Sequence, residues 1–232
     1  MSVIFLIEIE IRKFMVAIGE KAPNLKLGKW VQGMETNFDK EGDNVKLVEV
    51  FQVNCPGCFM YSMPEVINMY QKYKEEGLTV FGVATAFEDY DKNTLENLEM
   101  LLTTGEVVGD TKQALSQYGQ LDDGKLQFKI PYPVAMDSLV KETGEPSREK
   151  MTAFIKNQLP DFDSQPEDYK QQIFGRVKDY FKSKEYSAET FEMYSLQGTP
   201  STILVDRKGI LRDVSFGQAA GLDSMVQKLL NE

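Results

Sequence analysis

The chain has 232 residues, 42% of them hydrophobic, and its 26 basic and 36 acidic residues give a formal net charge of −10. This composition favours a globular protein with one domain of about 150 residues plus an elaboration, and the charge disfavours nucleic acid and anionic membranes as partners. There is no histidine, which removes the commonest metal ligand and the base of Cys-His catalysis, and two cysteines exclude a framework of several disulfides.

The amino-terminal residues do not match a targeting signal. The apolar run over residues 2–7 is short, and Glu8 and Glu10 follow it directly. A secretory signal needs a basic start and about 7–15 apolar residues, and a membrane helix needs about 20. We therefore expect a cytoplasmic protein in which residues 1–18 form an extension, either a strand or a loosely packed segment.

A strand, a helix and a second strand are predicted next. The largely apolar, β-branched residues 45–53 predict a buried strand that ends just before Cys55 and Cys58. Apolar residues then recur at helical spacing until Gly77, and residues 78–84 predict another strand. This order predicts a β-α-β unit with parallel strands and a right-handed crossover.

Further elements are predicted along the rest of the chain. Asn93 and Glu96 resemble a capping box at the start of a leucine-rich helix. A strand, a hairpin and a final helix are expected at 132–136, at 201–206 with 210–214, and at 222–230.

The segment from about 141 to 189 differs in kind from its surroundings. It contains two amphipathic patterns separated by Pro160 and Pro166, which predicts two helices. We interpret it as a helical insertion within a domain that spans residues 19–232.

All the thiol groups of the chain lie in one motif, Cys55-Pro56-Gly57-Cys58, between the predicted strand and helix. A helix amino terminus carries a partial positive charge that favours thiolate over thiol at Cys55, and the thiolate attacks disulfides. Cys58 lies one turn along and can resolve the mixed disulfide. A metal or cluster site and a pair of unreactive buried thiols are the alternative interpretations.

The stretch from Leu47 to Cys58 resembles the active-site strand and helix start of the thioredoxin superfamily. It is most similar to the redoxin branch, which includes TlpA-like thiol oxidoreductases and AhpC/TSA peroxiredoxins. The resemblance covers about residues 19–140 and 190–232. It implies a thioredoxin-like α/β fold, a three-layer sandwich with a mixed central sheet, and a cis-proline that follows the helical insertion predicted above.

The resemblance also implies roles for residues outside the dithiol. Gly198-Thr199-Pro200 fits the family's cis-proline pattern, so Thr199 and Pro200, together with Pro56 and Gly57, are expected to contact an extended substrate.

Glu49 lies six residues before Cys55, where thioredoxins carry a buried acid. A buried carboxyl has a raised pKa and can accept the proton of Cys58. The alternative is that Glu49 faces solvent or pairs with Lys46.

The chain departs from the family at several positions. Peroxiredoxins carry Thr or Ser three residues before the reactive cysteine and Pro seven before it, where this chain has Gln52 and Val48. Asn54 replaces the aromatic residue that thioredoxins place before the first cysteine. Pro64 follows Cys55 by nine residues, where the family usually has eight, so the first helical turn is expected to differ in geometry.

The predicted function is thiol-disulfide exchange, with Cys55 attacking a protein or small-molecule disulfide, Cys58 resolving the intermediate and an upstream donor supplying electrons. No cofactor or metal is implied. One alternative is a thiol peroxidase, in which Cys55 becomes a sulfenic acid. Another is a binding module that uses the fold as a scaffold. Met60 and Tyr61 are either core residues or part of a surface for apolar clients.

Overall fold

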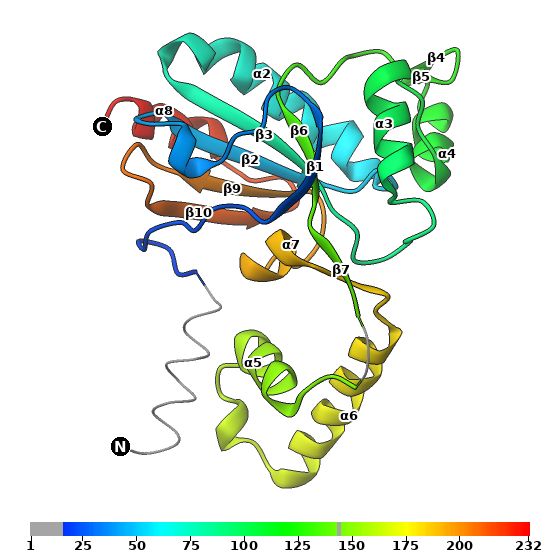
Figure 1. Cartoon of the computed structure of the whole chain (residues 1–232), viewed down its shortest axis with the longest axis vertical. Coiled ribbons are helices and arrows are strands. Elements are labelled where there is room, and N and C mark those ends of the chain that lie inside the picture. Colours follow the sequence, from blue (N-terminus) through cyan, green and yellow to red (C-terminus); the bar gives the residue numbers. More distant parts are fainter. Residues whose placement is uncertain (1–15, 143–144) are drawn as a thin grey trace. The chain divides into compact units, whose positions relative to one another are not determined.

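The computed structural model describes residues 16–142 and 145–232 (Figure 1). The predicted extension over residues 1–18 therefore lies almost entirely outside the described residues. The described chain forms two compact units, one made of residues 16–139 with 188–232 and the other of residues 140–187.

The larger unit is built on a six-stranded mixed sheet of order β1-β6-β3-β2-β9-β10. Its strands are β1 (Leu27–Gln32), β2 (Val45–Phe51), β3 (Leu78–Ala84), β6 (Val134–Asp137), β9 (Ser201–Val205) and β10 (Leu211–Phe216). Strand β3 runs parallel to both β2 and β6, whereas β9 runs antiparallel to β2 and β10. The predicted parallel β-α-β unit and carboxy-terminal hairpin are confirmed.

Helices surround this sheet in the larger unit. They are α2 (Met63–Tyr73), α3 (Leu95–Thr104), α4 (Gly109–Gln117), α7 (Glu189–Met193) and α8 (Leu222–Leu230), with short 3-10 turns η1 (Phe38–Lys40) and η3 (Lys74–Glu76). A small hairpin of β4 (Leu121–Asp122) and β5 (Lys125–Leu126) follows α4.

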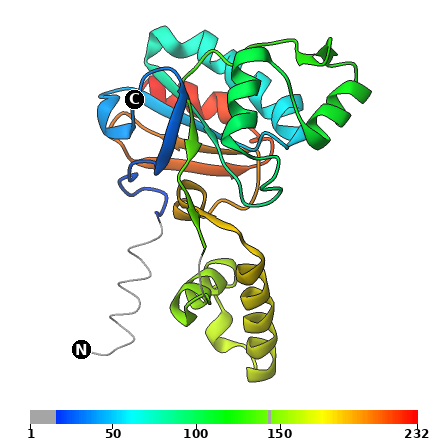
Figure 2. The same cartoon turned by 45° about the vertical axis from the view of Figure 1, so that its right-hand side comes forward.

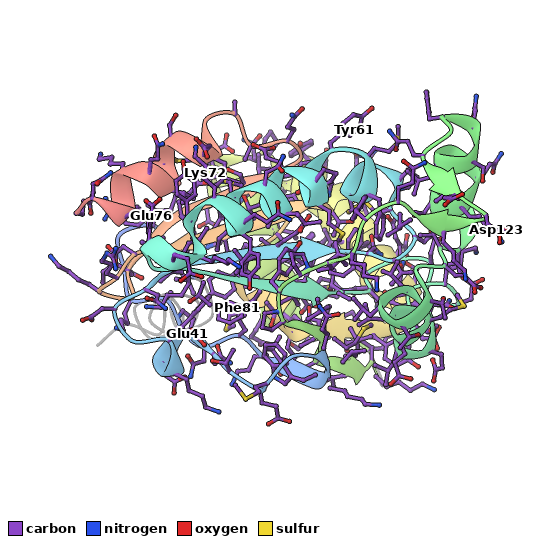
Figure 3. All side chains as sticks on the ribbon, turned by 90° about the horizontal axis from the view of Figure 1, so that it is seen from above. Glu41, Tyr61, Lys72, Glu76, Phe81 and Asp123 are labelled. Atoms are coloured by element: carbon purple, nitrogen blue, oxygen red, sulfur yellow. A yellow bond between two sulfur atoms is a disulfide. The ribbon has the colours of Figure 1, made fainter. Side chains whose placement is uncertain are left out.

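Strand β2 is buried on both faces, and its alternating side chains enter two separate cores. Leu47 and Phe51 pack with α2 and α8, whereas Val48 and Val50 pack with α7 on the opposite face. Figure 3 shows Phe81 on the face of the sheet away from α2. Helices on both faces make three layers, so the predicted α/β sandwich with a mixed sheet is confirmed.

The predicted capping box is displaced by one residue. Helix α3 begins after Thr94, whose side chain accepts a hydrogen bond from the N–H of Asn97. The side chain of Asn93 is instead buried and accepts a hydrogen bond from the N–H of Asn54. The prediction that Asn93 caps the helix is therefore wrong, because Asn93 pairs with a distant backbone group.

The smaller unit is helical, as its two amphipathic patterns predicted. Helices α5 (Arg148–Gln158) and α6 (Glu167–Ser183) pack against each other (Figure 2), with the 3-10 turn η4 (Phe162–Ser164) between them. The unit begins and ends in a two-stranded sheet of β7 (Leu139–Lys141) and β8 (Tyr186–Ala188). Aromatic rings from both helices and from η4 contact one another in this unit, namely Phe154, Phe162, Phe174, Tyr180 and Phe181.

Across residues 16–142 and 145–232, no helix has the length and apolar character that a bilayer crossing requires.

Candidate active site

The two cysteines lie where β2 gives way to a helix. Cys55 and Cys58 are joined by a disulfide, with their Cα atoms 5.4 Å apart. Cys55 keeps 9% of its surface exposed, whereas Cys58 is completely buried. Among the described residues, no group of three or more histidine, cysteine, aspartate or glutamate side chains is arranged to hold a metal ion. Of the two cysteines, only Cys55 keeps any exposed surface.

The backbone at the start of the helix stabilises negative charge on Cys55. The N–H of Cys58 points at Sγ of Cys55, 3.3 Å away. When the disulfide is reduced, this N–H and the partial positive charge of the helix amino terminus favour the thiolate. The fold therefore provides the N–H contact on which the predicted Cys55 thiolate depends.

The loop before β9 brings a second part of the chain to the sulfurs. The peptide bond between Thr199 and Pro200 is cis, which confirms the prediction for Pro200. The carbonyl oxygen of Thr199 lies 3.5 Å from Sγ of Cys55. A methyl group added at Gly57 would lie 3.9 Å from Cδ of Pro200. The fold thus places the predicted substrate-contacting residues beside the dithiol.

Gln52 holds this loop in place, a role that the sequence did not reveal. Its buried side chain accepts a hydrogen bond from the Thr199 hydroxyl at 3.0 Å and donates one to the carbonyl of Glu88 at 3.3 Å. The sequence singled out Gln52 only as a departure from peroxiredoxins. The structure shows that its amide ties the cis-proline loop to the end of β2.

Glu49 is fully buried on the face of β2 that carries Leu47 and Phe51. Burial raises the pKa of Glu49 to about 7, and the hydrogen bond that its Oε2 accepts from the Tyr132 hydroxyl, 2.5 Å long, partly offsets this rise. Lys46 instead donates to the carbonyl oxygen of Gly42. The alternative in which Glu49 faces solvent or pairs with Lys46 is therefore excluded.

The carboxyl of Glu49 lies beneath the turn that contains Cys58. The Ser62 hydroxyl is close enough to help stabilise the charged carboxylate, and Ser62 belongs to the same helical turn as Cys58. Cys58 and the apolar residues of this turn share one core cluster with the neighbours of Glu49 on β2. The predicted buried acid and the resolving cysteine therefore occupy the same side of the sheet.

The first helical turn has an unusual geometry, as the spacing of Pro64 indicated. Residues Cys58–Ser62 form a π-helical turn, and α2 follows from Met63 with Pro64 in its first turn. A π-turn accommodates one extra residue within a helix. It leaves Tyr61 57% exposed, with its side chain directed away from the sheet (Figure 3).

A second exposed aromatic residue lies beside the cis-proline loop. Phe216, at the end of β10, is 60% exposed, and its ring covers Gly198 so closely that an added Cβ there would lie 2.5 Å from it. The N–H of Gly217 donates to the carbonyl of Pro200 at 2.8 Å. Phe216 is another site residue that the sequence did not reveal, because only the β9-β10 pairing brings it to the loop.

Asn54, immediately before Cys55, organises the loops around the dithiol. Its Nδ2 donates to Oδ2 of Asp89 and its Oδ1 accepts from the N–H of Asp110, both at 2.7 Å. The second contact satisfies the first turn of α4, whose N-cap residue provides no side-chain hydrogen bond. A Cβ added at Gly109 would collide with Oδ1 of Asn54. Asn54 thus links the dithiol loop to α4 in place of an aromatic ring.

Replacing Asn54 by Ala is expected to lower the free energy of unfolding by about 2–3 kcal/mol, because a charge-assisted hydrogen bond and a helix cap are lost together. Urea denaturation of the oxidised protein measures this change. Asn231→Ala is the matched control, since Asn231 is exposed and its side chain donates to a carbonyl one turn earlier in the same helix. A loss at Asn54 no larger than that of the control contradicts the assigned role.

Comparison with known proteins places the fold. No protein-family model matches the chain, and no curated protein matches it in sequence. Among solved structures, it is similar to a thiol-disulfide isomerase from Corynebacterium glutamicum, with a TM-score of 0.55 and 24% identity over 92% of this chain and 97% of that one. It is also similar to a thioredoxin-like superfamily protein, with a TM-score of 0.52 and 22% identity over 93% of this chain and 98% of that one. The chain therefore has a thioredoxin-like fold.

Proposed function

We propose that the protein is a thiol-disulfide oxidoreductase that reduces disulfides through Cys55 and Cys58. The observation that carries this proposal is the position of the dithiol. Cys55 is partly exposed at a helix start, with the N–H of Cys58 on one side of its sulfur and the carbonyl of Thr199 on the other. The N–H and the helix start favour a thiolate nucleophile at Cys55, whereas the Thr199 carbonyl marks the side on which the substrate chain would lie.

The reaction needs two exchanges of sulfur bonds. The Cys55 thiolate attacks one sulfur of the substrate disulfide, and the other substrate sulfur leaves as a thiolate. Cys58 then loses its proton and attacks Sγ of Cys55, so that the Cys55–Cys58 disulfide forms and the second substrate sulfur leaves. The substrate gains two electrons, and an upstream thiol donor must return them to the protein.

Glu49 and the cis-proline loop support these two steps. A carboxyl whose pKa is about 7 can take up the Cys58 proton near neutral pH and release it again, which is the requirement for a general base. Thr199 and Pro200 lie beside the reactive sulfur and would align the substrate chain there, with Pro56 and Gly57 forming the opposite side.

The surface around the dithiol favours protein disulfides over small-molecule disulfides as substrates. Tyr61 and Phe216 expose aromatic rings on the π-turn and beside the cis-proline loop. Exposed aromatic side chains bind apolar groups of a partner chain. In a reducing compartment, the exchange would run toward reduction of the substrate.

The test is an equilibrium titration in glutathione redox buffers, with alkylation of free thiols and mass detection of Cys55 and Cys58. We expect a reversible two-electron transition between dithiol and disulfide. In the same preparation, the wild-type protein should catalyse reduction of a disulfide-bonded peptide, and Cys55→Ser should lower that rate by about a thousandfold or more.

Two results would contradict the proposal. A dithiol that stays reduced across the whole range of buffers favours a binding module. Steady consumption of hydroperoxide without peptide reduction favours a thiol peroxidase.

A further inference from the structure

Tyr132 is a buried residue that has no role in the two exchange steps described above. It lies two residues before β6, is 1% exposed and packs edge-on against Tyr70, with ring centroids 5.8 Å apart. Its hydroxyl donates to Oε2 of Glu49 at 2.5 Å, across 83 positions of sequence. A buried hydroxyl aimed at a buried carboxylate makes a strong, directional hydrogen bond.

This contact requires the ring to cross a strand. In the sheet, Glu49 on β2 is paired with Gly82 on β3, and Gly82 is paired with Val134 on β6. A Cβ at Gly82 would lie 3.3 Å from Cε2 of Tyr132 and 3.0 Å from a methyl group of Val134. Because Gly82 has no side chain, the Tyr132 ring can pass over β3 and reach Glu49.

Among the described residues, the second oxygen of the Glu49 carboxyl makes no complete hydrogen bond, although the Ser62 hydroxyl is near enough to stabilise the charged form. Within the described part of the chain, Oε1 of Glu49 makes no hydrogen bond that meets normal distance and angle limits. Thr202, paired with Glu49 across β9, also has a buried hydroxyl without a described partner. Ser62 and Glu65 face the carboxyl from the π-turn and α2, and the negative charge of Glu65 raises the pKa of Glu49.

We propose that Tyr132 is a positioning residue, which reaches over Gly82, holds Oε2 of Glu49 and thereby presents Oε1 to the Cys58 thiol. The inference rests on the proposed function. In the resolving step, the Cys58 proton passes to the Glu49 carboxylate while the Cys58 sulfur bonds to Cys55 and the substrate sulfur leaves. Tyr132 keeps its own proton and touches neither sulfur.

The decisive variant is Tyr132→Phe, which removes one hydroxyl and keeps the ring. A hydroxyl that donates to a carboxylate stabilises the charged form, so its loss should raise the pKa of Glu49 by about one pH unit. The limb of the pH-rate profile for the resolving step should move to higher pH by the same amount. Carboxyl ¹³C NMR of the oxidised protein measures the first change, and stopped-flow kinetics of a preformed mixed disulfide measures the second.

Two further variants make the test specific. Tyr73→Phe is the matched control, because Tyr73 is an equally buried tyrosine whose hydroxyl does not bond to Glu49, and it should move neither readout. Gly82→Ala keeps the Tyr132 hydroxyl but crowds its ring, and should raise the pKa of Glu49 in the same direction. It also provides the test if Tyr132→Phe does not fold.

The outcomes separate this inference from the proposed function. A folded, active Tyr132→Phe whose Glu49 titration and pH-rate limb match those of the wild type overturns the positioning role alone. A wild-type protein that exchanges no disulfides overturns the proposed function, and the positioning role with it.

Discussion

Replacing Glu49 by Gln is expected to stabilise the oxidised protein at pH 8.5 by about 3 kcal/mol. Glu49 is fully buried, and burial raises its pKa from 4.5 to about 7 in the folded state. The difference between these values, at about 1.4 kcal/mol per pH unit, gives the expected gain. Glutamine keeps the shape and an oxygen that can accept from Tyr132, but it never ionises.

The sign of the effect follows from the direction of the shift. Below pH 4.5, Glu49 is neutral in both the folded and unfolded states, so the wild type and variant should be nearly equally stable. Between pH 4.5 and about 7, the unfolded chain ionises while the folded protein resists ionisation, so the wild type loses stability as the pH rises through this window. Above about pH 7 the difference should be constant.

Urea denaturation at several pH values between 4 and 9 measures this difference. Glu75→Gln serves as the control, because Glu75 is an exposed glutamate in the turn η3, directly after α2. Equal pH dependence of Glu49→Gln and wild type would show that Glu49 does not carry the raised pKa. The same variant should also slow the resolving step, so stability and rate should change in opposite directions.

Replacing Cys58 by Ser is expected to trap Cys55 in a mixed disulfide with its substrate. Cys58 is completely buried beside Cys55, and its sulfur is the group that releases the substrate in the proposed reaction. A serine hydroxyl is a far weaker nucleophile, so turnover should fall by about a thousandfold or more while the first attack proceeds.

Mass spectrometry of the intact protein detects the trapped species. After mixing with oxidised glutathione or a disulfide-bonded peptide, Cys58→Ser should gain the mass of one substrate half, and a reductant should remove it. Cys55→Ser under the same conditions should gain none, because Cys58 is out of reach. Equal labelling of the two variants would mean that the roles of the two cysteines are not distinct.

Local patterns predicted the parts of the site that lie close in sequence. The Cys55–Cys58 motif follows an apolar strand and opens a helix, and both properties are visible in the order of residues 45–73. The cis bond before Pro200 was expected from the resemblance to the thioredoxin superfamily, which the Gly198-Thr199-Pro200 pattern carries. Hydrophobic periodicity was sufficient for the strand and the helix on either side of the dithiol, because each of these elements has a face that must be buried.

Contacts between distant elements were not predictable in the same way. The bonds from Tyr132 to Glu49 and from Thr199 to Gln52 join residues 83 and 147 positions apart. They depend on the order of strands in the sheet and on their register, which the sequence pattern does not determine. One signal was present: Gly82 interrupts an apolar strand, and glycine in a strand often marks the close approach of another group.

The π-turn has a consequence for aligning this chain with chains that place a proline eight residues after the first cysteine. One residue rotates a helix by about 100°, so an ungapped alignment that matches the cysteines would point the apolar face of α2 away from the sheet. The π-turn over Cys58–Ser62 absorbs the additional residue, so the dithiol and the buried side chains of α2 both keep their places. A faithful alignment must therefore open its gap inside the turn, between Cys58 and Pro64.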